Sequence, residues 1–191
     1  MKPIFVITAA ASILLVAPAE AATPGNQQEI NQALSALPSA LRAKASVITY
    51  NAKGDPLNLR WGDIDIYCVS NQARLPAFRV SCFPRVLKPQ EDMEAKERAE
   101  GKSAMAIRAD VDAAIAGGKL PTPFEGSTIY VRSGRNQADA QEMWVVTLHG
   151  IDAERMGLPT DKDNGTPWMM RSGTPEAHLM VPVKGSMEAG S

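Results

Sequence analysis

The sequence predicts an α+β fold with a mainly antiparallel sheet and two or three helices. Short segments of alternating apolar and polar residues fill residues 47–69 and recur between residues 127 and 181, as in half-buried strands. Residues 26–37 and 103–116 instead carry apolar residues at three- and four-residue spacing, the period of amphipathic helices. Strands, then helices, then a second group of strands is an order typical of an α+β fold.

The first 21 residues have the layout of a cleaved secretory signal. Lys2 precedes an uncharged apolar run over residues 4–16, and Ala19 and Ala21 are small residues at positions −3 and −1 of a cut after Ala21. The run is short for a membrane span, and no second apolar run follows. We therefore expect a periplasmic or secreted protein without an integral membrane anchor, whose mature chain, residues 22–191, forms one domain.

Composition limits the classes of partner. The net charge is −1 and lysine and arginine form no block, so no nucleic-acid partner is indicated. A small molecule or a protein remains open as partner, and neither is specified. The length remaining after cleavage favours a single domain with a substantial core.

The first helix is expected over residues 26–37. Asn26 can cap it, with Glu29 three residues later as in a capping box. Ile30, Leu34 and Leu37 share one face. Pro38 ends the helix, and residues 39–44 can form a further helical turn.

Three strands are expected next, over residues 47–50, 57–61 and 64–69. Turn-forming residues separate them, which predicts an antiparallel meander. In the third strand Ile64, Ile66 and Cys68 would share one face.

The two cysteines, Cys68 and Cys82, are predicted to form a disulfide, because the number is even and the chain is expected to be exported. The bond would tie residues 79–83 to the third strand. A loop of about 15 residues closed in this way stabilises the fold by about 3 kcal/mol in the chain-entropy model. The spacing is not that of a redox motif or of a thiolate metal site.

Two helices are expected in the middle of the chain. Residues 89–99 are rich in charge, which predicts an exposed helix with intrahelical ion pairs. Ser103 can cap a helix over residues 103–116, with Ala104, Ile107, Val111 and Ile115 as its buried stripe. Gly117 and Gly118 then end it.

The last third is expected to be β-structure, with strands over residues 127–132, 143–148, 168–170 and 178–181. A turn at residues 171–175 would join the last two strands. Trp168, Leu179 and Val181 are expected to be buried there.

Two groups of segments together resemble a family of uncharacterised exported bacterial proteins. The first group comprises Leu59-Arg60-Trp61-Gly62, Cys68, Cys82, Glu100-Gly101-Lys102-Ser103 and Gly118-Lys119-Leu120-Pro121. The second comprises Gly157-Leu158-Pro159-Thr160-Asp161, Pro167-Trp168-Met169-Met170, Gly173-Thr174-Pro175 and Ala177-His178-Leu179-Met180-Val181-Pro182-Val183. The resemblance covers most of the mature chain and implies export, but no activity. That family has Asn-Gly after its Arg-x-Gly motif, whereas Asp63 and Ile64 follow Gly62 here.

His149 and His178 are the two histidines and the candidate metal ligands. If they met across the sheet, Met143, Met170 or Met180 could add a soft ligand, and a set of methionine and histidine suits copper. The alternative is that each histidine is hydrogen-bonded at a strand end, and it is the favoured one. The nine methionines more often fill an irregular core.

Other chemistry has less support. Ser172, His178 and Asp161 could form a catalytic trio, although most proteins contain such a set. Asp63 and Asp65 lie two residues apart and are interpreted as a solvated strand face. Three further arginines could hold an anion: Arg60, Arg132 and Arg135.

The functional prediction is a non-enzymatic binding or accessory protein. The alternatives are a periplasmic hydrolase-like enzyme or a metal-binding protein that uses His149 or His178. No cofactor is specified.

Overall fold

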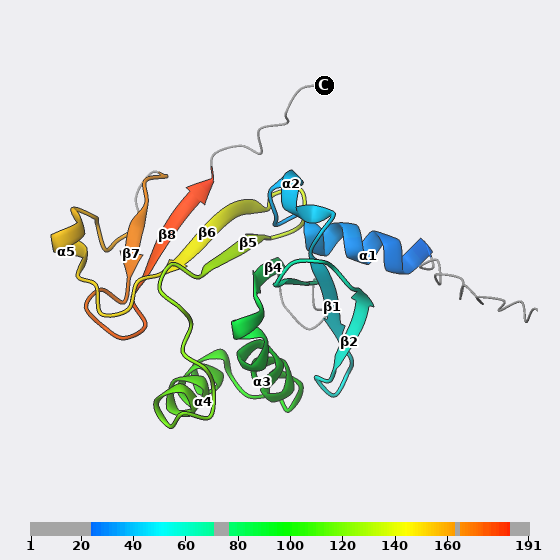
Figure 1. Cartoon of the computed structure of the whole chain (residues 1–191), viewed down its shortest axis with the longest axis horizontal. Coiled ribbons are helices and arrows are strands. Elements are labelled where there is room, and N and C mark those ends of the chain that lie inside the picture. Colours follow the sequence, from blue (N-terminus) through cyan, green and yellow to red (C-terminus); the bar gives the residue numbers. More distant parts are fainter. Residues whose placement is uncertain (1–23, 71–76, 163–164, 184–191) are drawn as a thin grey trace, which may run out of the picture.

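The computed structural model describes residues 24–70, 77–162 and 165–183, so the expected signal segment, residues 1–21, lies outside the described residues. These residues form an α+β fold around one eight-stranded sheet of order β2-β1-β3-β4-β5-β6-β8-β7 (Figure 1). Every strand pairing is antiparallel except that of β1 with β3. The predicted fold class is confirmed.

The strands are β1 (Ser46–Tyr50), β2 (Pro56–Arg60), β3 (Ile66–Val69), β4 (Phe78–Pro84), β5 (Thr128–Gly134), β6 (Gln141–Thr147), β7 (Trp168–Met170) and β8 (His178–Val183). The helices are α1 (Pro24–Leu34), α2 (Ser39–Arg42), α3 (Lys88–Ala99), α4 (Ala104–Ala116) and α5 (Ala153–Met156), with a 3₁₀ turn, η1 (Arg85–Leu87), before α3. The described residues thus hold more helices than predicted, because α2 and α5 add two helices of four residues each. Within these residues, no helix combines the length and the apolar character needed to cross a bilayer.

The predicted meander of the first three strands is wrong. β3 pairs with β1 in parallel, on the side opposite β2. After β2 the chain crosses the start of β1, where the backbone N–H groups of Asp63 and Ile64 both donate to the carbonyl of Lys44. Gly62 permits this crossing, because a Cβ there would lie 2.1 Å from the Lys44 oxygen.

Arg60, in the motif before this crossing, binds the backbone. Its guanidinium donates to the carbonyls of Arg42 and Ala45 at 2.5 and 2.6 Å. Burial lowers the pKa of Arg60 from its usual value. The side chain thus joins the end of β2 to the segment between α2 and β1.

The core lies on both faces of β1, β3 and β4. On one face Ile30, Leu34 and Leu37 are buried against the sheet, as predicted, and they pack with Val47, Cys68, Val80 and Cys82. The other face buries Ile48, Tyr67, Val69 and Phe83 together with Leu87, just before α3. Figure 1 shows α1 and α2 on one side of the sheet and α3 and α4 on the other.

The two middle helices agree only partly with their predicted faces. Ser103 caps α4, accepting a hydrogen bond from the Ala106 amide at 3.2 Å. Ile107 and Val111 are buried with Ala114, whereas Ala104 is exposed. α3 is not the fully solvated helix that its charges predicted, because Glu97 is buried and Glu91 half-buried.

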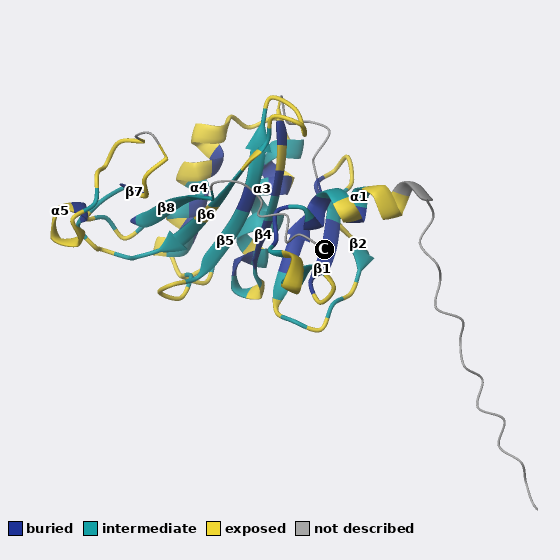
Figure 2. Ribbon diagram, turned by 90° about the horizontal axis from the view of Figure 1, so that it is seen from above, coloured by how far each residue is buried: buried dark blue, intermediate teal, exposed yellow. Residues whose placement is uncertain are grey.

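The C-terminal strands are less covered. Leu179 and Val181 are only half-buried, so their predicted burial is wrong, whereas Trp168 is buried as predicted. Directly paired residues on neighbouring strands lie on the same face of the sheet. The pairings Cys82–Tyr130, Tyr130–Trp144 and Trp144–Val181 therefore place Tyr130, Trp144 and Val181 on the face of Cys82, which α1 covers over β1, β3 and β4. Figure 2, seen from that side, shows no helix of the described chain over β5, β6 and β8.

Candidate functional site

The predicted disulfide is present. Cys68 and Cys82 are bonded, lie directly opposite each other on β3 and β4, and are fully buried. The bond therefore ties two neighbouring strands together inside the core. Such a bond fits an exported protein, because disulfides persist in oxidising compartments.

His149 lies in the loop after β6 and joins two other loops. Its Nδ1 lies 2.5 Å from the Pro175 carbonyl oxygen and its Nε2 2.8 Å from that of Pro123. Carbonyl oxygens only accept hydrogen bonds, so both ring nitrogens donate when the ring is the imidazolium. Although partial burial opposes the charge, the two carbonyls and the carboxylates of Glu125 and Glu176 raise the pKa of His149 above its usual value.

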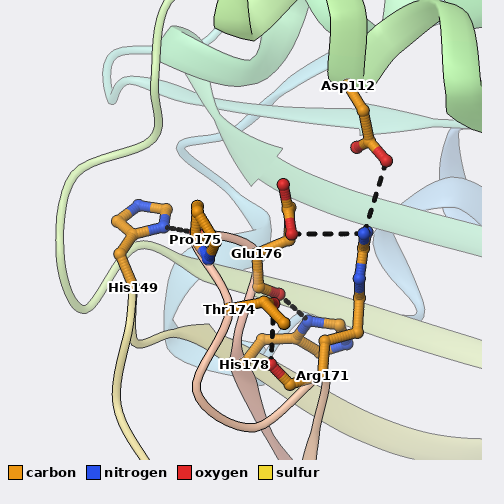
Figure 3. A network of polar contacts seen from close by, with 7 residues as sticks. All are labelled: Asp112, His149, Arg171, Thr174, Pro175, Glu176 and His178. Carbon is orange, nitrogen blue, oxygen red and sulfur yellow. Dashed lines mark hydrogen bonds and ion pairs between the residues drawn. The ribbon is translucent and has the colours of Figure 1, made fainter.

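His178, at the start of β8, is not joined to His149. Figure 3 shows the two rings on opposite sides of the Pro175–Glu176 backbone. His178 Nδ1 lies 2.8 Å from the Glu176 carbonyl oxygen. Met170 on β7 is paired with His178, and Met180 lies two residues further along β8, on the same face. The strand register thus places His178 opposite Met170 and on the same face as Met180.

A charged network surrounds the β7–β8 turn (Figure 3). Arg171 has a left-handed backbone conformation, with φ of 56°, and its guanidinium lies 3.4 Å from the Asp112 carboxylate of α4 and 3.2 Å from that of Glu176. The Thr174 hydroxyl donates to the Arg171 carbonyl at 2.7 Å. The network holds the turn against α4.

Most of the remaining sequence candidates have local partners. The Ser172 hydroxyl accepts a hydrogen bond from the Ala153 amide at 2.7 Å, and Asp161 is exposed. Asp65 pairs with Arg85 at 2.8 Å on the surface. Arg132 donates to the Gln137 carbonyl, and Arg135 pairs with Asp139.

A polar cavity lies between α3 and the ends of β3 and β4. Its volume is about 80 Å³, and besides Val69 its lining is charged or hydroxylated: Ser70, Arg79, Ser81, Glu91, Glu94 and Arg98. Glu91, Glu94 and Arg98 share one face of α3, because they are three and four residues apart. Arg79 and Ser81 alternate with core residues on β4 and point to the same side.

Contacts with the sheet fix the position of α3. The Tyr50 hydroxyl of β1 donates to Asp92 Oδ1 of α3 at 2.9 Å. The β1–β2 turn reaches the helix at Gly54, where a Cβ would lie 2.6 Å from the Ala95 oxygen. The helix therefore cannot shift away from the cavity without breaking these contacts.

Glu91 is the most perturbed acid of the cavity. Burial, and then the negative charge of Glu94, raise its pKa to about 7, although Arg98 and Arg79 oppose the shift. Glu94 is compensated differently, since it accepts a hydrogen bond from Gln90 at 2.9 Å and lies 3.6 Å from Arg98. Near neutral pH the cavity therefore holds one carboxyl group poised between its two forms.

The sequence pattern did not reveal this cavity. The spacing of Glu91, Glu94 and Arg98 was a usable signal, because it places three charges on one helix face. The charge density of the segment instead favoured a solvated helix. Nothing local indicated that Arg79 and Ser81, which are distant in sequence, would meet them.

A second surface feature is the open face, defined here as Tyr130, Trp144, Val146, Leu179 and Val181. The rings of Tyr130 and Trp144 meet edge to face, with centroids 5.6 Å apart, and Trp144 is 36% exposed. The other four residues are half-buried.

Comparison of the chain with protein-family models, with curated proteins and with solved structures gave no match.

Proposed function

We propose that this chain is an exported, non-enzymatic binding protein that docks an amphipathic helix of a partner protein on its open face. The observation that carries the proposal is the apolar surface of β5, β6 and β8, over which no described helix lies (Figure 2). Sheets with one apolar face are normally covered by helices or by a second sheet. A partner helix would complete the layer that α1 begins over β1, β3 and β4.

The dimensions suit a helix. Three neighbouring strands span about 10 Å between the outer two, and a helix with its side chains is about 10–12 Å wide. The aromatic pair of Tyr130 and Trp144 offers large apolar contact at little cost in side-chain entropy, as anchor residues do in protein interfaces.

Charge favours a protein over a nucleic acid or an anionic membrane. Arg132 and Glu142 are paired opposite each other at the edge of the open face, so the two charges balance. The chain as a whole is nearly neutral. A helix with an apolar stripe and a polar outer side matches this surface.

The test is selection of helix binders. We expect a displayed library of amphipathic peptides of about four turns to yield ligands that shift the backbone amide signals of β5, β6 and β8. Trp144→Ser should weaken binding roughly tenfold or more. Trp61→Ser is the matched control, because Trp61 is 75% exposed but lies after β2, and it should bind as the wild type does.

Three results would overturn the proposal. One is a selection that yields no helical ligand, and another is a ligand that binds Trp144→Ser and wild type equally. The third is a dimer in sedimentation that Trp144→Ser dissociates, since the open face would then be an interface between copies.

Export itself is tested by the intact mass of protein from the extracytoplasmic fraction, which should correspond to residues 22–191.

A soft-metal site is a second candidate, favoured by the pairing of β7 with β8. If His178 Nδ1–H donates to the Glu176 carbonyl, Nε2 keeps its lone pair for a metal, as in many histidine ligands. The thioethers of Met170 and Met180 would supply soft ligands suited to Cu(I). Competition with a Cu(I) chelator should show weaker binding in Met170→Leu than in the control Met156→Leu, whose methionine is exposed on α5. Equal Cu(I) affinity of the two variants would eliminate this site. The hydrolase alternative stays a prediction.

A further inference from the structure

The His149 ring fits its surroundings only in the protonated form. Its Nδ1 lies 2.5 Å from the Pro175 carbonyl oxygen (Figure 3) and its Nε2 lies 2.8 Å from the Pro123 carbonyl oxygen. A neutral imidazole carries a single N–H, so one of these oxygens would face a nitrogen lone pair at hydrogen-bond distance. Both contacts are therefore satisfied only by the imidazolium, which has no lone pair left for a metal.

The Pro175 side of this link is anchored by other hydrogen bonds. The amide of Gly150 donates to the Thr174 carbonyl at 2.8 Å, and the amide of Leu148 donates to the Ala177 carbonyl at 2.9 Å. These two bonds flank Pro175 on both sides, so the β7–β8 turn stays beside the loop after β6 whatever the charge of the ring.

The Pro123 side has less support. Residues 121–123 connect α4 to β5, and the first two of them are exposed. Neither of these two takes part in a backbone hydrogen bond within the described parts of the chain. The next anchor is the Phe124 carbonyl, which accepts from the Thr147 hydroxyl at 2.7 Å. The contact with His149 is therefore what fixes the Pro123 carbonyl.

We propose that the His149–Pro123 hydrogen bond is a pH-sensitive latch, closed while the ring is an imidazolium and open once the ring has lost a proton. The remaining proton stays on Nδ1, toward the anchored Pro175 carbonyl, and the lone pair of Nε2 then repels the Pro123 oxygen. Histidine is the side chain whose charge ordinarily changes between pH 5 and pH 8. The latch acts on the segment that enters β5 and is independent of what the open face binds.

Carboxylates face the ring from two elements and favour the closed latch. Glu125 lies just before β5, and its Oε1 accepts from the His149 amide at 2.8 Å. Glu176 lies in the β7–β8 turn, 3.2 Å from the Arg171 guanidinium. Although burial opposes the charge, the two carbonyl oxygens and these carboxylates raise the pKa of His149 above its usual value. The latch should therefore open above about pH 6.5.

Opening the latch should loosen the connection between α4 and the sheet. α4 packs against α3, and the ion pair of Asp112 with Arg171 joins it to the β7–β8 turn at 3.4 Å. A partly exposed ion pair contributes little by itself. Deprotonation of His149 should therefore give the segment between α4 and β5 more freedom.

The experiment is an NMR titration of the protein from pH 5 to pH 9 that follows the ring nitrogens of His149 and the backbone amides of Thr122 and Phe124 together. We expect both amide signals to shift with the same midpoint as the ring, above about pH 6.5. Their order parameters should fall from about 0.85 to below about 0.6 as the ring deprotonates, whereas those of Gly150 and Ala177 should stay near about 0.85.

Three variants separate the latch from a general effect of pH. In His149→Gln the side chain is always neutral, so the amide signals of Thr122 and Phe124 should no longer titrate. Glu125→Gln keeps an oxygen that can accept from the His149 amide but removes the charge, so the midpoint should fall by roughly half a pH unit. Glu100→Gln, the control, removes the same charge from an exposed residue after α3 and should leave the midpoint unchanged.

The proposal is overturned if the His149 ring titrates while Thr122 and Phe124 do not respond, or if His149→Gln keeps their full pH dependence. It is equally overturned if Glu125→Gln leaves the midpoint where it was. A loss of order at Gly150 and Ala177 as large as that at Phe124 would also overturn it, because the Pro175 side would then open too.

Discussion

The two halves of the sheet are built by different means. In the covered half, β2-β1-β3-β4, helices lie on both faces and the strand residues Val47, Cys68, Val80 and Cys82 are almost inaccessible to solvent. In the open half, β5-β6-β8-β7, all six residues of β8 are half-buried. A disulfide adds to the covered half, whereas loops joined by His149 and Arg171 brace the open half. We infer that the covered half supplies most of the stability and that the open half is kept accessible for binding.

Trp168 offers the strongest challenge to this comparison, because it is a buried residue in the open half. It is 5% exposed, and Lys162 lies 6.0 Å from the centre of its ring. Trp168→Ala should lower the free energy of unfolding by about 3–5 kcal/mol in urea denaturation. Trp61→Ala changes a tryptophan that is 75% exposed and should alter the free energy of unfolding by less than about 0.5 kcal/mol. Similar small losses in both variants would mean that the edge of the open half contributes little to stability.

A pair of leucines compares the halves directly. Leu37, just after α1, is buried, with 1% of its surface exposed. Leu179 is half-buried on the open face. Leu37→Ala should cost about 2–5 kcal/mol of unfolding free energy, whereas Leu179→Ala should cost about 1 kcal/mol, since less apolar area leaves water there. The measurement is again urea denaturation. Equal losses would show that the open face is as well packed as the core, and our distinction between the halves would fail.

The disulfide tests what stabilises the covered half. The double variant Cys68→Ala/Cys82→Ala lacks the bond between two residues that are 14 apart in sequence, so the loop between them is no longer closed in the unfolded chain. The double variant should lose about 3 kcal/mol, seen as a lower urea midpoint. A reducing agent should lower the midpoint of the wild type toward that of the variant and leave the variant unaffected. A double variant as stable as the oxidised wild type would contradict this role.

Sequence patterns predicted elements better than their partners. The Ile30, Leu34 and Leu37 stripe and the Ser103 cap follow from local spacing, and the Cys68–Cys82 bond was predicted from the even number of cysteines and the expected export. The parallel pairing of β3 with β1 could not be predicted from local spacing. It depends on the close approach of Gly62 to Lys44, and sequence rules for tight turns do not describe such a contact between two segments.

The candidate sites show the same limit. His178 was a candidate ligand, with a hydrogen bond at a strand end as the favoured alternative, and its pairing with Met170 is visible only once β7 and β8 are in register. Glu91 was interpreted as part of a solvated helix, because its burial comes from the sheet beneath α3 and not from its neighbours in sequence. The half-buried state of Leu179 and Val181 follows from the absence of a covering helix among the described residues, which an alternating strand pattern does not reveal.

The smallest expected effect is a pH dependence that belongs to the open half. Because the folded pKa of His149 is raised above its unfolded value of about 6.5, its contribution to stability is complete below about pH 6.5. That contribution is lost as the pH rises through the folded pKa.

Glu91 also lowers stability as the pH rises, between its unfolded pKa of about 4.3 and about 7, but it does so in every variant that retains it. Subtracting the unfolding free energy of His149→Gln from that of the wild type therefore isolates His149, and the difference should shrink from pH 6 to pH 8.5. His178→Gln is the control and should leave this pH dependence in place. A difference that stays constant with pH would mean that the imidazolium does not hold the Pro123 and Pro175 loops together.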